Sequence, residues 1–405
     1  MSCAEHLQRL LALALPLRDV LEQRVDTPAA PIWCETRGWS PFLLTLDDVT
    51  VATAEAHGLA AVLPGLAKAP PSLTELAAAV TDATRLPMLR GATPLDSEAL
   101  RSVRFRKRAQ LSALLSAVSG MAKAAERIVD VGAGSGHFTR LSADLFERDA
   151  VGLEHNPVRV ESARQRSQAS VRASFASVDA RDALELSARD LAIGLHACGE
   201  LGDKLIEAAG AAQCDLALVS CCLQKISGPE RAPLSRTATA THAGLRREHL
   251  GLANLTAQPQ GVEASIDVTI AARQTRYALG QLLRARGIAL EPGAEMSGVN
   301  RRQANAGLRR IAERALALRE LQPPSDAEIA AHEAAARRDY AVIRRLSLPR
   351  SMLARLVEVL VSLDRAAHLE ERGLAVSVAT LFDRRVSPRN IGIFASQSAA
   401  RLPAA

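Results

Sequence analysis

Three glycines at alternate positions form the first pattern in this chain that predicts a ligand site. The segment Val129-Asp-Val-Gly-Ala-Gly-Ser-Gly-His137 contains Gly132, Gly134 and Gly136. Glycine permits a tight turn and lets backbone N–H groups approach a ligand with no Cβ in the way. A dinucleotide-binding loop has the pattern G-x-G-x-x-G, which would require a glycine where this chain has His137. The observed G-x-G-x-G therefore favours S-adenosylmethionine over NAD.

Carboxylates follow the next two β-rich runs, where a bound nucleoside would need acceptors. Glu154 lies 20 residues after the second glycine, and its two oxygens can accept hydrogen bonds from both ribose hydroxyls. His155 beside it is a further candidate for cofactor binding. Asp179 can accept from the adenine amino group while the N–H group of Ala180 meets a ring nitrogen. Asp130 is expected either to orient the glycine loop or to bind the methionine ammonium group.

Each of these residues alone has an ordinary structural explanation, such as a turn, a helix cap or a solvated strand end. Their order at successive strand ends favours a ligand site, because ligands gather at the carboxyl edge of parallel sheets.

An imidazole and a set of thiols follow two later β-rich runs. Gly194-Leu-His-Ala-Cys-Gly199 contains His196 and Cys198, and Val219-Ser-Cys-Cys222 contains Cys221. We predict that these side chains lie near the reactive methyl group. His196 is the first candidate for a general base or an acceptor-orienting group, because imidazole titrates near neutral pH. A buried, hydrogen-bonded histidine that stabilises the strand is the alternative.

Two adjacent cysteines on one strand point to opposite sides of the sheet. We therefore expect at most one of Cys221 and Cys222 to face the cofactor, while the other packs inertly. A zinc ion bound by His196, Cys198 and Cys221 is an alternative, because these ligands come from adjacent strand ends. The prediction that we retain is a site without metal.

The elements that position these residues follow from hydrophobic patterning. Five β-rich runs alternate with helical patterns, which indicates βαβ units and a parallel sheet. The runs cover residues 128–131, 150–153, 173–178, 191–195 and 215–220. A helical pattern over 352–369 precedes two more runs, 375–382 and 390–395, whose short connection predicts a terminal antiparallel hairpin. The expected fold is an α/β, Rossmann-like sheet.

We predict four segments along the chain. They are a helical N-terminal region (1–120), the first part of the sheet domain (121–223), an Arg-rich helical insertion (224–350), and the closing helix and hairpin (351–405). The basic run 101–108 is expected to begin an amphipathic helix, with a solvated face as the favoured interpretation and contact with phosphate as the alternative.

Composition limits the class of protein. The formal net charge is +6 and the isoelectric point about 9.3. Residues 271–350 hold 15 arginines against 8 acidic residues, which could attract an RNA backbone. Tyr277 and Tyr340 are the only aromatic residues there, which favours structured RNA over stacked single strands. Six cysteines without a C-x-x-C pair fit a reducing cytoplasm, and no apolar run is long enough to cross a membrane.

Together with the glycine loop, His196-Ala-Cys-Gly199 and Cys221-Cys222 resemble a family of methyltransferase domains. This family includes the eukaryotic methyltransferase-like (ribosomal RNA adenine dimethylase domain-containing) proteins, tRNA acceptor-stem 2′-O-methyltransferases and bacterial relatives. The segments 41–48 and 387–390 extend the resemblance towards both ends. It implies a seven-stranded methyltransferase sheet whose last strand is antiparallel.

The chain departs from the tRNA enzymes because it has no Cys/His spacing typical of their small zinc modules. It also has no N/D-P-P-Y motif after the fourth strand. The acceptor therefore cannot be transferred by analogy. The sequence predicts an S-adenosylmethionine-dependent methyltransferase acting by in-line displacement on structured RNA (tRNA or rRNA), on protein or on a small molecule. A non-catalytic nucleoside-binding adaptor is the remaining alternative.

Overall fold

The computed structural model describes residues 1–89, 103, 105–167, 170–181, 184–254, 263–291 and 293–404. The chain forms two compact units, and each is built from segments that are distant in sequence. Unit 1 comprises residues 1–22, 78–259 and 353–405, and unit 2 comprises residues 23–77 and 260–352.

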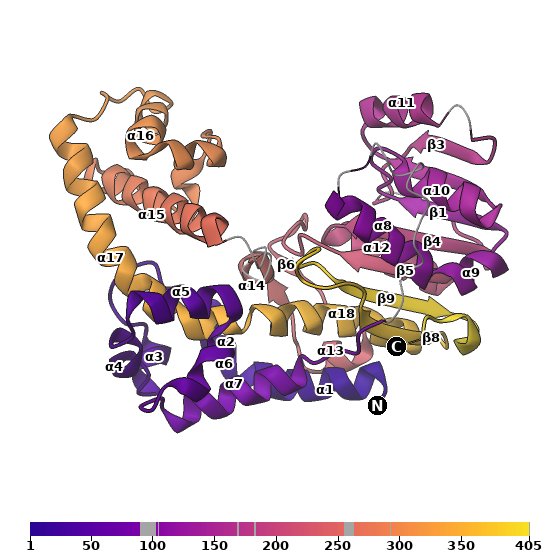
Figure 1. The fold of residues 1–405 in the computed structure, drawn as a ribbon, viewed down its shortest axis with the longest axis horizontal. Coiled ribbons are helices and arrows are strands. Elements are labelled where there is room, and N and C mark those ends of the chain that lie inside the picture. The colour runs from indigo at the N-terminus through magenta and orange to yellow at the C-terminus, as the bar shows by residue number, and fades with distance from the viewer. Residues whose placement is uncertain are drawn as a thin grey trace. The chain divides into compact units, whose positions relative to one another are not determined.

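Unit 1 contains a seven-stranded sheet with the strand order β3-β2-β1-β4-β5-β9-β8 (Figure 1). Its strands are β1 (Arg127–Val131), β2 (Asp149–Glu154), β3 (Ala173–Ser177), β4 (Asp190–Ala197), β5 (Asp215–Ser220), β8 (Ala375–Thr380) and β9 (Ile391–Ser396). Strands β1 to β5 pair in parallel, and β9 is antiparallel to both β5 and β8. The predicted Rossmann-like, seven-stranded sheet with its terminal antiparallel hairpin is confirmed.

Helices cover both faces of this sheet, which explains why its central strands are apolar on both sides. On one face, α8 (Phe105–Ala117), α9 (Ser119–Ala124) and α10 (His137–Phe146) share a core with Ile193 and Val219. On the other face, α12 (Glu200–Ala212) packs on β4 and β5, where Leu205 lies against the flat surface at Gly194. Helix α18 (Ala354–Glu370) packs on β8 and β9, and α1 (Cys3–Ala14) packs on α18.

The remaining elements of unit 1 are short, and several of them connect the strands. They are η1 (Leu15–Leu17), α2 (Arg18–Glu22), α11 (Pro157–Arg166), β6 (Glu230–Arg231), α13 (Arg236–Ala240), β7 (Leu245–Arg246), α14 (Arg247–Leu252) and η6 (Ala399–Arg401). Strands β6 and β7 form a separate two-stranded sheet.

Unit 2 is helical. It contains α3 (Ile32–Thr36), α4 (Ser40–Leu44), α5 (Asp48–His57), α6 (Leu59–Val62), η2 (Leu63–Gly65), α15 (Glu263–Ala285), η4 (Ala294–Met296), η5 (Arg301–Ala306), α16 (Leu308–Ala317) and α17 (Asp326–Met352). Helix α7 (Pro71–Ala83) crosses the boundary between unit 2 and unit 1. Buried Leu279, Leu282 and Ile311 belong to one core that joins α15 and α16. Helix α17 also packs on α4, α5 and α6.

The two units divide the chain differently from the predicted segments. Part of the N-terminal region, 23–77, belongs to unit 2, because Glu55 pairs with Arg344 at 2.6 Å and Asp48 pairs with Arg345 at 2.7 Å. Of the basic run 101–108, residues 101, 102 and 104 lie outside the described residues, and α8 begins at Phe105.

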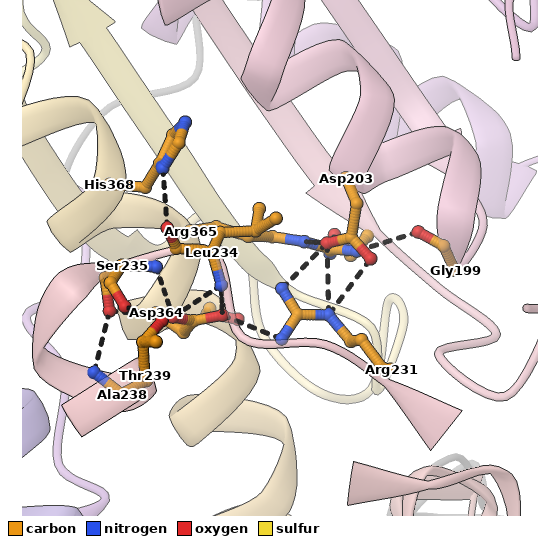
Figure 2. Close-up of polar contacts among 12 residues, drawn as sticks. Gly199, Asp203, Arg231, Leu234, Ser235, Ala238, Thr239, Asp364, Arg365 and His368 are labelled. Carbon is orange, nitrogen blue, oxygen red and sulfur yellow. Dashed lines mark hydrogen bonds and ion pairs between the residues drawn. The ribbon is translucent and has the colours of Figure 1, made fainter. Parts of the chain in front are cut away.

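The first part of the predicted insertion, 224–259, belongs to unit 1. Asp364 on α18 attaches this segment, because its carboxylate accepts hydrogen bonds from the backbone of Leu234 and Ser235 and pairs with Arg231 at 2.7 Å (Figure 2). Partners this far apart in sequence leave no local pattern from which the boundary could be predicted.

Within the part of the chain that the structure describes, no helix combines the length and the apolar character required to cross a lipid bilayer.

Candidate active site

The glycine loop connects the end of β1 to the start of α10. Gly132, Gly134 and Gly136 all have positive φ, at 78°, 59° and 72°. The N–H group of Gly134 donates to Glu154 Oε2 at 3.0 Å, and Asn156 N donates to the other carboxylate oxygen at 3.1 Å. Glu154 is only 4% exposed. The predicted acidic residue and the predicted loop are therefore in direct contact.

The three glycines differ in the space around them. A Cβ on Gly132 or Gly134 would meet nothing closer than 3.7 Å, whereas a Cβ on Gly136 would lie 2.6 Å from the Phe175 ring. The first two positions need glycine for their backbone conformation, because a Cβ there would make only ordinary van der Waals contacts. Gly136 is also required for the packing of the loop on β3.

Asp130 connects β1 to α10 beneath this loop. Its buried carboxylate accepts a hydrogen bond from Thr139 Oγ1 at 2.6 Å. Burial raises the pKa of Asp130 to about 6, although the Thr139 hydrogen bond and the charge of Lys107 act in the opposite direction. The contact with Thr139 supports the loop-orienting role, which was one of the two alternatives for this residue.

Asp179 and Ala180 lie in the loop after β3. Asp179 pairs with Arg181 at 2.5 Å, and this hydrogen bond lowers the pKa of Asp179 to about 2. Ala180 is buried. His155, whose side chain is 66% exposed, has its Nδ1 atom 3.0 Å from Glu154 Oε1. An adenine amino group at this position would have to share the Asp179 carboxylate with Arg181.

His196 lies in a distorted part of β4. The pairing with β5 shifts register between Leu195 and Ala197, and His196 has a φ of +70°, which is uncommon for a residue with a Cβ. Its Nε2 atom lies 3.1 Å from Gln110 Oε1 on α8. Burial, and then the charge of Lys107, lower the pKa of His196. The imidazole is therefore neutral at pH 7 and able to accept a proton.

Three thiols meet beside His196. The Sγ atoms of Cys198, Cys221 and Cys222 all lie within 4.8 Å of one another, and Cys198 and Cys221 both donate to His196 O at 3.3 Å. The prediction that Cys221 and Cys222 point to opposite sides of a strand is wrong, because β5 ends at Ser220 and the chain turns there.

The thiol cluster has unequal proton affinities. A hydrogen bond from Cys221, aided by the charge of Lys225, lowers the pKa of Cys198. The same hydrogen bond, together with burial, raises the pKa of Cys221.

Sequence reasoning missed two residues on α8. Gln110 is the partner of His196, and the ammonium group of Lys107 acts electrostatically on Asp130, His137 and His196. Burial lowers the pKa of Lys107. The basic run that contains Lys107 was interpreted as a solvated face, but Lys107 is one of only five lysines in an arginine-rich chain. That unusual choice of residue was the available signal.

Residues 106–229 match a family model described as a methyltransferase domain. This range, less than a third of the chain, is similar to a methyltransferase domain. The matched range begins in α8 and includes the glycine loop, Glu154, His196 and the three thiols. The match agrees with the predicted S-adenosylmethionine-dependent methyltransferase, and the particular family predicted from the resemblance stays a prediction.

Solved structures that resemble part of this chain include two methyltransferases. A sugar N-methyltransferase from a Streptoalloteichus species is 18% identical, with 33% of this chain and 60% of that chain covered and a TM-score of 0.24. An amino pentose methyltransferase from Micromonospora echinaspora is 23% identical, with 33% and 58% covered and a TM-score of 0.24. This chain covers less than two thirds of each, and these values carry no conclusion about the acceptor.

Proposed function

We propose that the methyltransferase domain binds S-adenosylmethionine at the carboxyl edge of β1 to β3 and positions a methyl acceptor at the edge of β4 and β5. The observation that carries this proposal is the hydrogen bond from Gly134 N to the buried carboxylate of Glu154. It joins the two parts of a nucleoside site, the turn that admits the ligand and the acceptor for its ribose hydroxyls.

The residues present fit such a ligand. The positive φ values of Gly132 and Gly134 fit a tight turn that brings backbone N–H groups close to a nucleoside. Glu154 Oε2 accepts one backbone hydrogen bond and has capacity for a second. Glu154 Oε1 accepts one from Asn156 N and also lies 3.0 Å from His155 Nδ1, an exposed ring that a ribose hydroxyl would have to replace. Two vicinal ribose hydroxyls require two such acceptors.

When bound, the cofactor supplies the electrophilic methyl group, so the protein has mainly to position the acceptor and exclude water. Lys107 places a cation near Asp130, where it suits the carboxylate of the methionine moiety. Asp130 anchors the loop through Thr139.

His196 is the group that can take a proton from the acceptor. With the Gln110 oxygen facing the ring, Nε2 carries the hydrogen and donates, and Nδ1 keeps a lone pair. A pKa lowered by burial keeps this imidazole neutral at physiological pH. A neutral imidazole is the form that acts as a general base.

Cofactor binding is the first test. Isothermal titration calorimetry with S-adenosylhomocysteine should give a saturable heat for the full chain, and Glu154→Gln should weaken affinity about 10- to 100-fold, as expected for loss of charge-assisted hydrogen bonds. Glu161→Gln, on the exposed surface of α11, is the matched control and should bind as the wild type does. Equal affinities of the two variants, with both folded by circular dichroism, would contradict the proposed site.

The acceptor requires a separate experiment. Purified protein with radiolabelled S-adenosylmethionine is incubated with total RNA, protein extract or metabolites, and the labelled fraction names the acceptor class. RNA was predicted from the arginine excess. Unit 2 as a whole, however, holds 18 Lys and Arg against 16 Asp and Glu side chains, so the folded unit is far less basic than the segment 271–350. Label in RNA that declines steeply with salt would support the prediction, and label confined to metabolites would exclude it.

A further inference from the structure

The three thiols of unit 1 form the one group of three His, Cys, Asp or Glu side chains with metal-ligand spacing among the described residues. Cys198 follows β4, and Cys221 and Cys222 follow β5. The three are partly buried, and none takes part in a disulfide. Cofactor binding at β1 to β3 does not use them.

One guanidinium group, that of Arg365, forms hydrogen bonds with the residues next to these thiols. Arg365 on α18 is fully buried, and its Nη2 donates to Gly199 O at 2.8 Å while Nη1 donates to Ser220 Oγ at 2.5 Å. Gly199 directly follows Cys198, and Ser220 directly precedes Cys221. A single side chain therefore sets the separation of the two cysteine-bearing turns.

Arg365 is itself fixed by a buried ion network (Figure 2). Its Nε donates to Asp203 at 2.8 Å, and Asp203 and Asp364 both bind Arg231, at 2.8 and 2.7 Å. Two cations and two anions balance within the network. This balance lets the charges stay buried next to the two turns.

A contact between Gly199 and Lys225 brings the segment that carries Cys222 close to Cys198. Gly199 has a φ of +48°, and a Cβ there would overlap the carbonyl oxygen of Lys225. That carbonyl accepts from Glu200 N at 2.9 Å, and Lys225 N donates to Cys222 O at 3.1 Å. The segment after β5 therefore lies directly against the turn that carries Cys198.

We propose that Cys198, Cys221 and Cys222 bind one zinc ion through their sulfur atoms. Thiolates on a tetrahedral zinc, with Zn–S bonds of about 2.3 Å, lie about 3.8 Å apart. Sulfur atoms already within 4.8 Å need only small side-chain rotations to reach that spacing. Three protein ligands leave the fourth position for water or a substrate atom, as in catalytic zinc sites.

Charge and proton balance are consistent with binding. Each thiol gives up its proton, so one Zn²⁺ displaces three protons and the resulting centre carries one negative charge. Lys225, whose cation acts on Cys198, offsets that charge. Binding gives up the two S–H···O contacts to His196 O, which are weak hydrogen bonds.

The proposed zinc site differs from both predictions that the sequence offered about metal binding. We predicted no metal, and the alternative used His196 in place of Cys222. The imidazole Nε2 contacts Gln110, and His196 supplies only its carbonyl to the cluster. The third ligand is instead the second cysteine of the adjacent pair.

The test uses the full chain, stripped of metal under reducing conditions and then reloaded. Zinc content after dialysis is measured by mass spectrometry, and Co²⁺ is titrated as a spectroscopic probe. We expect one metal per chain and thiolate-to-cobalt charge-transfer absorption corresponding to three sulfur ligands. Changes of residues around metal ligands cost about 10- to 100-fold in affinity, so Cys198→Ser and Cys222→Ser should each cost at least that.

Cys214→Ala is the matched control, because Cys214 is a buried thiol that directly precedes β5 and lies outside the cluster. It should bind cobalt with wild-type affinity. If a cysteine variant does not fold, the charge-transfer intensity of the wild type still counts the sulfur ligands. Less than half an equivalent of metal, a spectrum without thiolate bands, or equal loss in Cys214→Ala would each overturn the proposal. Failure of cofactor binding would leave the metal result unaffected, since the two assays are independent.

Discussion

Replacing Asp203 by asparagine tests how strongly the buried ion network stabilises unit 1. Asp203 accepts from Arg365 Nε and from Arg231 Nη2, each at 2.8 Å, and the two arginines are 0% and 6% exposed. Asparagine has nearly the same volume, so no cavity forms. The change leaves Arg231 with Asp364 and removes the carboxylate that Arg365 faces. Breaking a buried ion pair costs about 3–5 kcal/mol, and we expect a loss in that range.

The dependence on pH provides a second measure of the same interaction. Burial alone would raise the pKa of Asp203, but the charges of Arg365 and Arg231 outweigh burial and hold the pKa below its usual value. A lowered folded-state pKa gives stability that is complete above the unfolded-state pKa and is lost as pH falls through the folded-state pKa. The stability difference between wild type and Asp203→Asn should therefore be full at pH 7 and shrink in acid.

The assay has to report unit 1 separately. Both tryptophans, Trp33 and Trp39, lie in unit 2, so their fluorescence monitors that unit alone. Hydrogen exchange measured on peptides of α12 and α18 reports the network. Asp203→Asn should speed exchange in those helices and leave tryptophan unfolding in urea unchanged.

Glu207→Gln is the control for loss of a carboxylate on the same helix. Glu207 forms an exposed ion pair with Lys204 at 3.0 Å, and such a pair is worth about 0.5 kcal/mol or less. If Asp203→Asn destabilised unit 1 by no more than this control, or if its effect did not diminish in acid, the network would not be a stabilising element.

Three further predictions concern the methyltransferase site. Gly136→Ala should destabilise unit 1 by about 1–3 kcal/mol in thermal unfolding, because the new Cβ would lie 2.6 Å from the Phe175 ring. Unchanged stability would show that the Phe175 ring can shift to accommodate the new methyl group. His196→Asn retains a residue that tolerates positive φ, and methyl transfer should fall about 100-fold or more with unchanged cofactor affinity; full turnover would reduce His196 to a structural role. Lys107→Met should raise the pKa of His196 measured by NMR titration, because burial and, after it, the Lys107 cation lower that pKa in the wild type. An unchanged pKa would show that Lys107 does not act on His196.

The sheet could be predicted from the sequence because its signals are local. Each β-rich run lies between helical patterns, and the observed strands begin and end within two residues of most predicted runs. Glu154 could be found because strand ends in a parallel sheet share one edge, so a carboxylate at a fixed distance after the glycines had to lie near them. The structure places it in contact with Gly134.

The failures occurred where partners are distant in sequence. Asp364 lies about 130 residues after the Leu234 backbone that it binds, so no periodicity could assign the segment to unit 1. Cys221 and Cys222 were placed by strand alternation, which ceases to hold once β5 ends at Ser220. Lys107 was assigned to solvent because helical charge patterns are usually solvated faces, and only tertiary packing brings it beside Asp130.

Stability alone does not explain why a buried ion network, rather than apolar side chains, lies next to the turns that carry Cys198 and Cys221. Apolar residues of similar volume often replace buried ion networks without loss of stability. An apolar side chain could not, however, donate at once to the Gly199 carbonyl and to the Ser220 hydroxyl, as Arg365 does. The guanidinium needs Asp203 to stay buried, and Arg231 with Asp364 completes the charge balance. The network is therefore best understood as the support that fixes the two cysteine-bearing turns, and its stabilising energy is a consequence of that support.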